Sequence, residues 1–462
     1  MNAARSDGGS VSAVLLLAAL ALLGGAVPER VRAAPERMTL ADAVASGLDR
    51  NSGARIARLE SDAARNAVGE TRATYLPQVS VATFAGYSNR FDEKLQAIDR
   101  NGVEREYGLA TISADEGWFN VYVDQLLFDL SQVRLIEREQ LAAEAAQLAE
   151  RHEREEAAYE ITRSYAELVR LERLAEVADR TTADAEWLHN QARVLSQAGR
   201  ALSLEREQVA LYLDEARLEA RTTRDRVLAG RAALSEAIGR DEADGEGPDV
   251  VPESLPRLTP DHLEEPPAAA IEDAPDLKVL ALRRRMEEAS VASARALRFP
   301  KVRLRGGYSH YGIKRFDNFP DETFVGVAMD VPVFDGLRSQ NAVQGAHRSV
   351  EIAGLRYRTA LAQRRRELKE LTARLAEQSE RSVLAERWAE TAQERQRLAD
   401  LRLRADRGSV GDALAARQDA ARRMREAVGS RFDTVDVWAV LHARTGSLTR
   451  AVVGERVAAA AD

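Results

Sequence analysis

The sequence predicts a mainly α-helical protein with a β part that crosses a membrane, built from two copies of one helix–β-hairpin–long-helix unit. Three observations predict this fold. The stretch from Leu130 to Gln197 contains neither proline nor glycine, and as one helix it would be about 100 Å long. Segments that follow Pro77 and Pro300 alternate apolar with polar or small residues, which is the period of a β-strand. The chain also resembles itself over these segments.

The composition excludes several function classes. The 462 residues carry a formal net charge of −8, with acidic and basic residues interleaved. No basic stripe is present to hold a phosphate backbone, so nucleic acid is not an expected partner. The chain has no cysteine, which excludes disulfides, thiolate metal sites, a cysteine nucleophile and a lipid-modified N-terminal cysteine.

Residues 1–33 are interpreted as a signal peptide. Val11 to Val27 forms a continuous apolar run after Arg5, and small residues favour cleavage near Ala33 or Ala34. A single membrane-anchor helix is the alternative, although the run is short for a span of about 20 residues. Since no other stretch is apolar enough to cross a bilayer as a helix, a membrane-embedded mature protein would have to cross with strands.

The first repeat is expected over residues 34–240. It contains a helix, a β-hairpin at about 77–128, the long helix, a break (the first tip) near Gly199, and a returning helix. Val79 and Val81 alternate with polar residues in one strand, and Val121 and Val123 alternate with polar residues in the other. The part of this hairpin from about 89 to 115 is longer than its counterpart at 312–322, and we expect it to form an external loop.

Residues 241–275 are expected to form an extended connector, because they contain seven prolines and many acids. The second repeat follows at 276–446, with a helix, a β-hairpin at about 300–334, a long helix, a tip near Gly408 and a returning helix. Residues 447–462 are a C-terminal tail. When the units are aligned, Pro77 meets Pro300, and Leu127-Phe128-Asp129 is echoed by Val333-Phe334-Asp335.

Heptad spacing predicts coiled-coil packing in the helices. Two leucine series recur every seven residues, namely Leu204, Leu211 and Leu218 in one helix, and Leu361, Leu368 and Leu375 in another. In the last helix, Met424, Val428, Phe432, Val435 and Leu441 recur at three- and four-residue steps. We expect all three series to be buried seams.

Four strands of about ten residues have the length and period of transmembrane barrel strands, but the smallest membrane barrels need eight. Open edges in lipid leave costly unpaired backbone groups, so such a chain would have to pool strands with other copies. A soluble sheet predicts the same alternation. Aromatic residues near these strands are candidates for interfacial belts, or for ordinary strand packing; they are Trp118, Phe119, Tyr122, Tyr308 and Tyr311.

Short motifs in a fixed order, most of them duplicated, carry a family resemblance. They are Met38-Thr39-Leu40-Ala41-Asp42-Ala43, Asn51, Tyr75-Leu76-Pro77-Gln78-Val79, Leu126-Leu127-Phe128-Asp129, Phe299-Pro300-Lys301-Val302, Val331-Pro332-Val333-Phe334-Asp335-Gly336, Gly239 and Gly446. Over essentially the whole mature chain, the sequence resembles the TolC-like outer-membrane efflux (outer-membrane factor) family.

The resemblance implies a homotrimer in the outer membrane that extends into the periplasm. Three chains would form a 12-stranded β-barrel continued by an α-helical coiled-coil barrel. It implies a passive exit duct of a tripartite efflux or type I secretion system. The expected partners are a periplasmic adaptor protein, through it an inner-membrane pump, and outer-membrane lipid.

The resemblance also assigns site residues. The two tips would contact the adaptor through Gly199, Leu202, Ser203, Gly408, Ser409, Val410 and Leu414. Asp412 is a candidate pore constriction, although its spacing from Gly408 is shorter than in the family and Ala415 occupies the place of a second acid. Helix-turn glycines and a helix N-cap acid are the simpler interpretations. Helix–strand junctions are expected at Pro77, Pro300, Pro332 and Gly336.

Two other function classes compete with a channel. A periplasmic coiled-coil adaptor or interaction protein would show one hairpin and a split lipoyl-like domain, whereas this chain shows two hairpins. An enzyme would need convergent acid, base or nucleophile groups, and none is found, so no catalytic residue or cofactor is expected. Glu186 and His189 form one Glu-x-x-His motif, but a di-iron site needs two, and no metal is expected.

Overall fold

The computed structural model describes residues 37–89, 94–98, 104–108, 113–199, 202–240, 248–256, 258, 271–313 and 321–454. The signal-peptide prediction, most of the predicted connector and the end of the C-terminal tail lie outside the described residues. The description below concerns the parts of the chain within these ranges.

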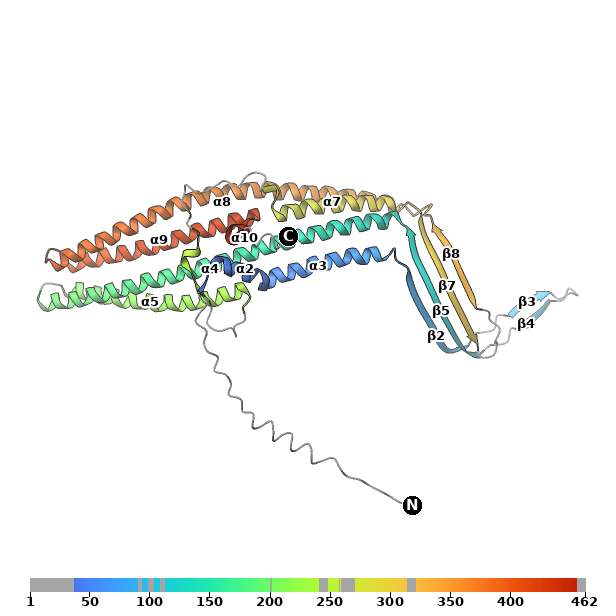
Figure 1. Cartoon of the computed structure of the whole chain (residues 1–462), viewed down its shortest axis with the longest axis horizontal. Helices are drawn as coiled ribbons and strands as arrows, with labels where there is room; N and C mark the ends of the chain where they lie inside the picture. Colours follow the sequence, from blue (N-terminus) through green and yellow to red (C-terminus); the bar gives the residue numbers. More distant parts are fainter. Residues whose placement is uncertain are drawn as a thin grey trace, which may run out of the picture.

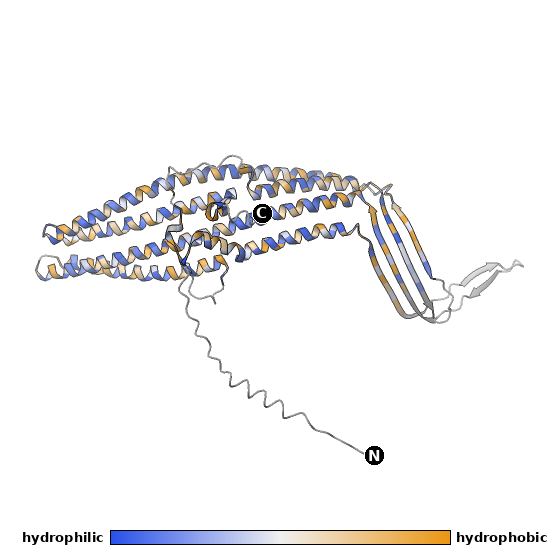
Figure 2. Cartoon of the chain, in the orientation of Figure 1, coloured by the Kyte–Doolittle hydropathy of each residue, from blue (hydrophilic) through white to orange (hydrophobic). Residues whose placement is uncertain are grey.

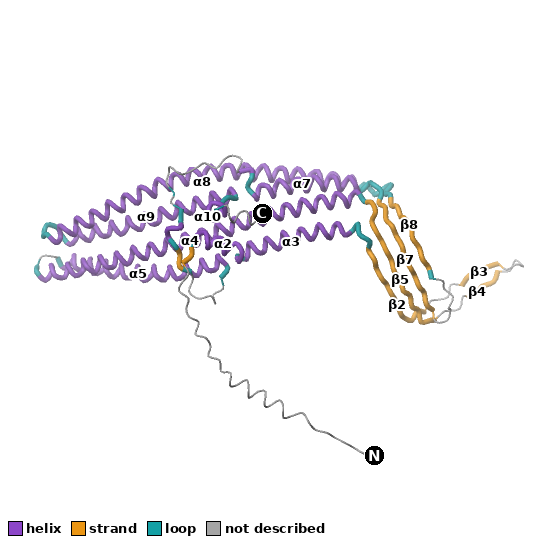
Figure 3. Tube along the Cα trace, viewed as in Figure 1, coloured by secondary structure: helices purple, strands orange, loops and turns teal. Residues whose placement is uncertain are grey.

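Two units of the same element order follow one another along the chain. The first consists of α3 (Ser52–Ala73), β2 (Gln78–Asn89), β5 (Ser113–Phe128), α4 (Leu130–Gln197) and α5 (Ser203–Ile238). The second consists of α7 (Pro275–Ala296), β7 (Lys301–Ile313), β8 (Glu322–Asp330), α8 (Arg338–Arg404) and α9 (Val410–Thr445). The helices of the two units occupy one end of an elongated molecule, and their strands occupy the other (Figures 1 and 3).

The helices lie side by side in a single layer, and the two longest, α4 and α8, run the full length of this layer. α4 packs against α3 and α5, which follow one another along it, and also against α7 and α9. α8 packs in turn against α7 and α9. The array is therefore ordered α3/α5, α4, α7/α9, α8, with α3/α5 at one edge and α8 at the other (Figure 1).

Short elements gather at the middle of the helical array. They are β1 (Arg37–Met38), α2 (Leu40–Arg50), β6 (Asp249–Val250), the 3₁₀ helix η2 (Pro252–Ser254) and α10 (Leu448–Val453). The fully buried Tyr165 of α4 holds them, since its hydroxyl lies 2.9 Å from the carbonyl oxygens of Met38 and Val251. A buried apolar cluster that includes Val44 and Leu448 surrounds this phenol. Both ends of the described chain are thus fastened to one core.

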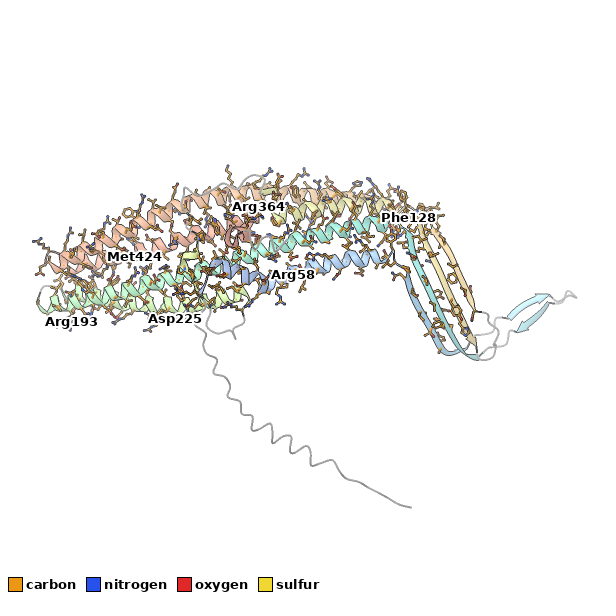
Figure 4. The ribbon with its side chains drawn as sticks, viewed as in Figure 1. Arg58, Phe128, Arg193, Asp225, Arg364 and Met424 are labelled. Atoms are coloured by element: carbon orange, nitrogen blue, oxygen red, sulfur yellow. The ribbon has the colours of Figure 1, made fainter. Side chains whose placement is uncertain are left out.

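At the same point along the helical array, charged side chains connect the helices of the second unit to α4. Arg364 of α8, labelled in Figure 4, donates to Asp276 Oδ2 of α7 and to the carbonyl of Arg444 in α9, both at 2.6 Å. Arg444 also reaches Glu156 of α4 at 2.6 Å. The network ties three helices of the second unit to the long helix of the first.

The main sheet is fully antiparallel, in the order β2-β5-β7-β8. Its register aligns Val79 with Val123, Val123 with Gly306, and Gly306 with Val325. Valines of three strands therefore share one face, which we call the aliphatic face, while Gln78, Asp124 and Arg305 share the other, the polar face. Figure 2 shows the resulting alternation of hydropathy along the strands. A separate hairpin, β3 (Lys94–Ile98) with β4 (Glu104–Gly108), lies beyond the far end of the sheet (Figure 1).

The second hairpin, predicted at about 300–334, ends earlier in the structure. β8 ends at Asp330, so Val331 and Val333 lie in the turn toward α8 rather than in the strand. Pro332 between them has no N–H to give to a sheet ladder. A period-2 pattern of valines therefore continued past the point where pairing stops.

One of the three predicted seams is wrong within this chain. Leu368 and Leu375 are buried as expected, but Leu204, Leu211 and Leu218 of α5 are 60%, 64% and 63% exposed. The buried face of α5 carries Val209, Tyr212, Leu213 and Ala216 instead. The heptad leucines form an apolar stripe that no other part of the described chain covers. Among the described residues, no helix has the length and hydrophobicity needed to cross a membrane.

Candidate functional site

The first helix tip is an exposed turn between α4 and α5. Gly199 adopts a left-handed conformation with φ of 68°, which glycine takes without the steric cost of a Cβ. Leu202, the N-cap residue of α5, is 69% exposed, and Ser203 is exposed beside it. The backbone N–H of Leu202 donates to Glu205 Oε2 at 3.0 Å. The predicted tip residues at Gly199, Leu202 and Ser203 therefore lie together on an accessible turn.

The second tip is built by a reciprocal helix cap. Ser409 N donates to Asp412 Oδ2 at 3.3 Å, and Asp412 N donates to Ser409 Oγ at 3.0 Å. A Cβ on Gly408 would lie 3.2 Å from Leu403 N, so a larger residue would crowd the end of α8. Asp412 is exposed, and its carboxylate serves the N-terminus of α9, where a negative charge is favoured.

The two tips are joined by a residue that the sequence analysis missed. Glu205 of α5 accepts from Gly411 N, at the start of α9, at 3.3 Å. One carboxylate therefore caps its own helix with one oxygen and contacts the other tip with its second oxygen. Its position three residues after Leu202 is the spacing of a capping acid, which could have identified the local contact but not the contact with the second unit.

Two of the predicted adaptor-contacting residues are buried under the tips. Val410 is 2% and Leu414 7% exposed. They pack in an apolar cluster with residues of all four tip helices, such as Leu188 of α4 and Val209 of α5. The other five predicted tip residues form the accessible surface, and these two support it from below.

A charged cluster lies just behind the tips. Arg417 of α9 is 3% exposed and pairs with Asp400 of α8 at 2.5 Å. The indole of Trp187 on α4 stacks against it, 4.6 Å from the guanidinium carbon, with Arg404 at 5.1 Å. Burial raises the pKa of Asp400, and Arg417 opposes this shift. The cluster joins three helices, and no sequence motif points to it.

The strand–helix junctions have the predicted prolines. Pro77 directly precedes β2 and Pro300 directly precedes β7. Pro332 and Gly336 lie between β8 and α8, where Gly336 and Leu337 have φ of 64° and 67°. Two consecutive left-handed residues reverse the chain direction from strand to helix.

An aspartate starts each long helix. Asp129 caps α4 by accepting from Ser131 N at 2.9 Å, and it binds Lys301 Nζ of β7 at 3.1 Å (Phe128, beside it, is labelled in Figure 4). Asp335, two residues before the N-cap residue Leu337 of α8, accepts from Ser339 N in the first turn at 2.9 Å. The Phe-Asp echo in the sequence thus has a common structural role.

The Glu-x-x-His motif has no partner motif beside it in the described parts of the chain. Glu186, the acid of the Glu-x-x-His motif, pairs with Arg217 at 2.8 Å. Among the described residues, no group of three or more metal-ligating side chains comes together. What these residues build is an exposed pair of tips at one end and a charged junction with the sheet at the other.

The comparisons with known proteins agree with this geometry. Residues 267–447 match the family model described as outer membrane efflux protein. No curated protein matches the chain. Solved structures match nearly its whole length, including the outer membrane protein VceC from Vibrio cholerae, with a TM-score of 0.71, 16% identity, and coverage of 88% of this chain and 96% of that chain.

Two further structures show the same fold. A membrane protein from Pseudomonas aeruginosa has a TM-score of 0.75 and 19% identity, over 89% of this chain and 91% of that chain. The CmeC outer membrane channel from Campylobacter jejuni has a TM-score of 0.74 and 14% identity, over 88% of this chain and 86% of that chain. The resemblance identified from the sequence is therefore confirmed, as is the mainly helical fold with a strand part.

Proposed function

We propose that this chain, which matches outer membrane efflux proteins in its second half and outer-membrane channels in its fold, is one subunit of a homotrimeric exit duct. The duct would cross the outer membrane with its strands and reach into the periplasm with its helices. It would act passively in a tripartite efflux or type I secretion system. The observation that carries the proposal is that both the sheet and the helical array have two outer edges that nothing in the described chain covers.

Each edge strand of the main sheet is paired on one side only. β2 and β8 each have one neighbour in the sheet, and unpaired strand edges in lipid cost several kcal/mol for each unsatisfied group. The aliphatic face is exposed on both edge strands, with Val79 of β2 65% accessible and Val325 and Val327 of β8 79% and 65% accessible. Pairing β2 of one copy with β8 of the next would remove the edges, and three four-stranded sheets would supply twelve strands.

The helical edges carry apolar stripes of the same kind. α5 exposes Leu204, Leu211 and Leu218 at one edge of the array. α8, at the opposite edge, exposes Leu384, Trp388, Leu398 and Leu401. Because different surfaces would meet at each contact, the interface is heterologous, and such an interface closes into a ring when the rotation permits.

We further propose that the tips form the periplasmic end of the channel. An adaptor would dock there and link the channel to an inner-membrane pump. The accessible tip residues Gly199, Leu202, Ser203, Gly408 and Ser409 would meet the adaptor first. Asp412 lies exposed on the same turn, and in the assembled ring it would be close enough to the axis to narrow the pore. The β3–β4 insert would then lie outside the cell, and residues 1–33 would direct export.

A cysteine pair across the proposed interface tests the ring. By helical rise, Leu218 lies about 28 Å from Gly199 and Leu384 about 36 Å from Gly408. Rotation about an axis along the helices preserves height, so in neighbouring copies the two residues would be offset by about 8 Å along the axis, which a short bismaleimide can span. Since the chain has no native cysteine, a Leu218→Cys/Leu384→Cys variant offers only this pair to a short bismaleimide.

The expected result in isolated outer membranes is a cross-linked series that stops at three chains. Each single-cysteine variant serves as the control and should stay uncross-linked. Products that continue beyond three chains would mean an open filament. A monomer in the soluble periplasmic fraction would overturn the channel proposal in favour of a coiled-coil interaction protein with an ordinary sheet.

A further inference from the structure

The aromatic residues near the strands do not form a single belt. Register places Trp118 and Tyr122 on the polar face, with Asp124, whereas Phe119 and Tyr308 lie on the aliphatic face, with Val121. Rings on the aliphatic face can contact lipid. The two on the polar face need another explanation, since the interior of a membrane barrel is normally polar.

Phe324 of β8 and Tyr122 of β5 cover a glycine on the polar face. A Cβ added to Gly307, which lies between them on β7, would be 2.6 Å from Phe324 Cε1 and 3.1 Å from Tyr122 Cδ1. The rings nevertheless remain 42% and 37% exposed. Glycine thus lets two aromatic rings lie flat over the sheet while keeping much of their surface open.

A second aromatic pair extends this surface. Phe84 and Trp118 stack with ring centroids 6.0 Å apart, four residues farther along the strands from Tyr122. Phe84 lies over Gly86 and is 43% exposed. The four rings form a track along the polar face, which we call the aromatic track.

Two arginines lie at the end of the aromatic track that is nearer to the helices. Arg305 is two residues from Gly307, about 7 Å along the strand. Arg305 Nε donates to Asp124 Oδ2 at 2.8 Å, and Arg303 Nη1 donates to Asp124 Oδ1 at 3.3 Å. Both guanidinium groups therefore share one carboxylate and keep N–H donors free, with side chains 44% and 55% exposed for Arg303 and Arg305.

The remaining described charges on this face belong to groups placed farther from that pair. Lys301 is bound to Asp129 at 3.1 Å, and Asp330 is opposite Lys301 in the register. Glu322 is opposite Ser309, on the far side of Phe324 from Arg305. The aromatic pair thus has two arginines that share one carboxylate at one end, while Glu322 is two residues from Phe324 at the other end.

We propose that Tyr122, Phe324 and Arg305 form a contact site for planar aromatic anions passing through the duct. The ring of the molecule would stack on the two side chains, and its carboxylate or sulfonate would accept from Arg305 and Arg303. Stacking and a charge-assisted hydrogen bond act about 7 Å apart, which is the length of a small aromatic acid. The inference rests on the proposed function, because it requires the polar face to line the lumen.

The test is equilibrium dialysis of 2-naphthoate against the purified protein in phosphatidylcholine nanodiscs, with empty nanodiscs as the blank. We expect saturable binding of one molecule per chain. Arg305→Gln should weaken it about tenfold, Arg305→Lys should weaken it less, and Tyr122→Ser/Phe324→Ser should abolish saturation. The cation 2-naphthylmethylammonium should show no saturable binding.

Arg397→Gln is the matched control, because that arginine lies exposed on α8, away from the sheet. Binding that is equal in the wild type and Arg305→Gln, or equal for the cation and the anion, would overturn the inference. Conductance of the same protein in planar bilayers separates the two proposals. A conducting protein without selective binding rejects only the aromatic site, whereas a non-conducting monomer rejects the channel itself.

Discussion

Asp129 is a single residue that connects the two units. It is 6% exposed, it caps α4 through the N–H groups of Ser131 and Gln132, and it binds Lys301 of the second unit. The Tyr75 hydroxyl donates to its carbonyl at 2.8 Å. One side chain therefore fixes where the long helix begins and how the sheet meets it.

We expect Asp129→Ala to lower the free energy of unfolding by about 1–2 kcal/mol, the cost of losing an N-cap. Burial raises the pKa of Asp129, but hydrogen bonds from Ser131 and Lys301 outweigh it and hold the pKa below its usual range. The stabilisation is therefore complete above the usual aspartate pKa of about 3.9 and is lost as the pH falls below it.

Melting temperature between pH 7 and pH 3 measures this prediction on protein in detergent. The melting temperature of Asp129→Asn should fall less steeply on acidification than that of the wild type. Asp225→Asn, at an exposed position of α5 labelled in Figure 4, is the control and should follow the wild type. Identical acid profiles for all three proteins would contradict the role given to Asp129.

Arg417 gives a second prediction at the residue scale. Arg417→Met should destabilise the protein by about 3 kcal/mol, because it leaves Asp400 half-buried without its partner. Arg417→Met/Asp400→Leu should recover most of that loss, since no charge then remains to be solvated. A double-mutant cycle from urea unfolding measures both effects. If the double variant proved as unstable as the single one, the pair would not be the source of the loss.

Helix ends show how the duplication works at the scale of elements. α5 and α9 both end in a left-handed glycine, Gly239 with φ of 76° and Gly446 with φ of 69°. A Cβ at Gly239 would lie 2.7 Å from Arg50 O, and one at Gly446 would lie 2.7 Å from Pro275 Cδ. Each stop therefore allows the next segment to approach closely.

Alanine substitutions at these two helix-ending glycines should lower the free energy of unfolding. We expect Gly239→Ala and Gly446→Ala each to destabilise by at least about 1–2 kcal/mol, from the left-handed conformation alone. Gly429→Ala is the matched control, because Gly429 lies inside α9 with open space around its Cα. There alanine should stabilise by about 0.5–1 kcal/mol. Thermal unfolding of the three variants decides the prediction, and a loss at Gly429 equal to that at Gly239 would contradict it.

Element bounds were predictable where local chemistry determines them. The stretch without proline and glycine from Leu130 to Gln197 coincides with α4, because Asp129 supplies the cap and Gly199 the turn. The end of β8 was placed too late, since alternation does not reveal where strand pairing stops. Glu205 and Arg417 were missed because their partners are in segments remote in the sequence.

The leucines of α5 mark the limit of sequence patterns at the scale of the whole molecule. Heptad spacing correctly predicted that one face of α5 is apolar, but it does not say which chain covers that face. In the structure, this chain covers a different face of α5 and leaves Leu211 and Leu218 exposed. A pattern that is wrong for the single chain thus becomes evidence for an assembly.

Charge placed in the stripe tests that assembly without a cross-linker. Leu218→Glu should prevent the ring from closing, because an unpaired carboxylate would be buried between copies. The fold of the single chain should persist, since the substituted side chain is 63% exposed in it. Light scattering of the detergent-solubilised protein should report a monomer, and circular dichroism should report unchanged helicity.

A compensating charge on the opposite edge makes the prediction specific. Leu384→Lys alone should also block assembly, whereas Leu218→Glu/Leu384→Lys should restore trimers, because each new carboxylate would then meet an ammonium group of the neighbouring copy. Arg224→Gln, on the side of α5 that faces Asp179 of α4, should leave assembly intact. Trimers in the single Leu218→Glu variant would show that this edge stays in water. A double variant that remains monomeric, while both singles are also monomeric, would show that the two positions do not face each other, so that α5 must meet a different part of its neighbour.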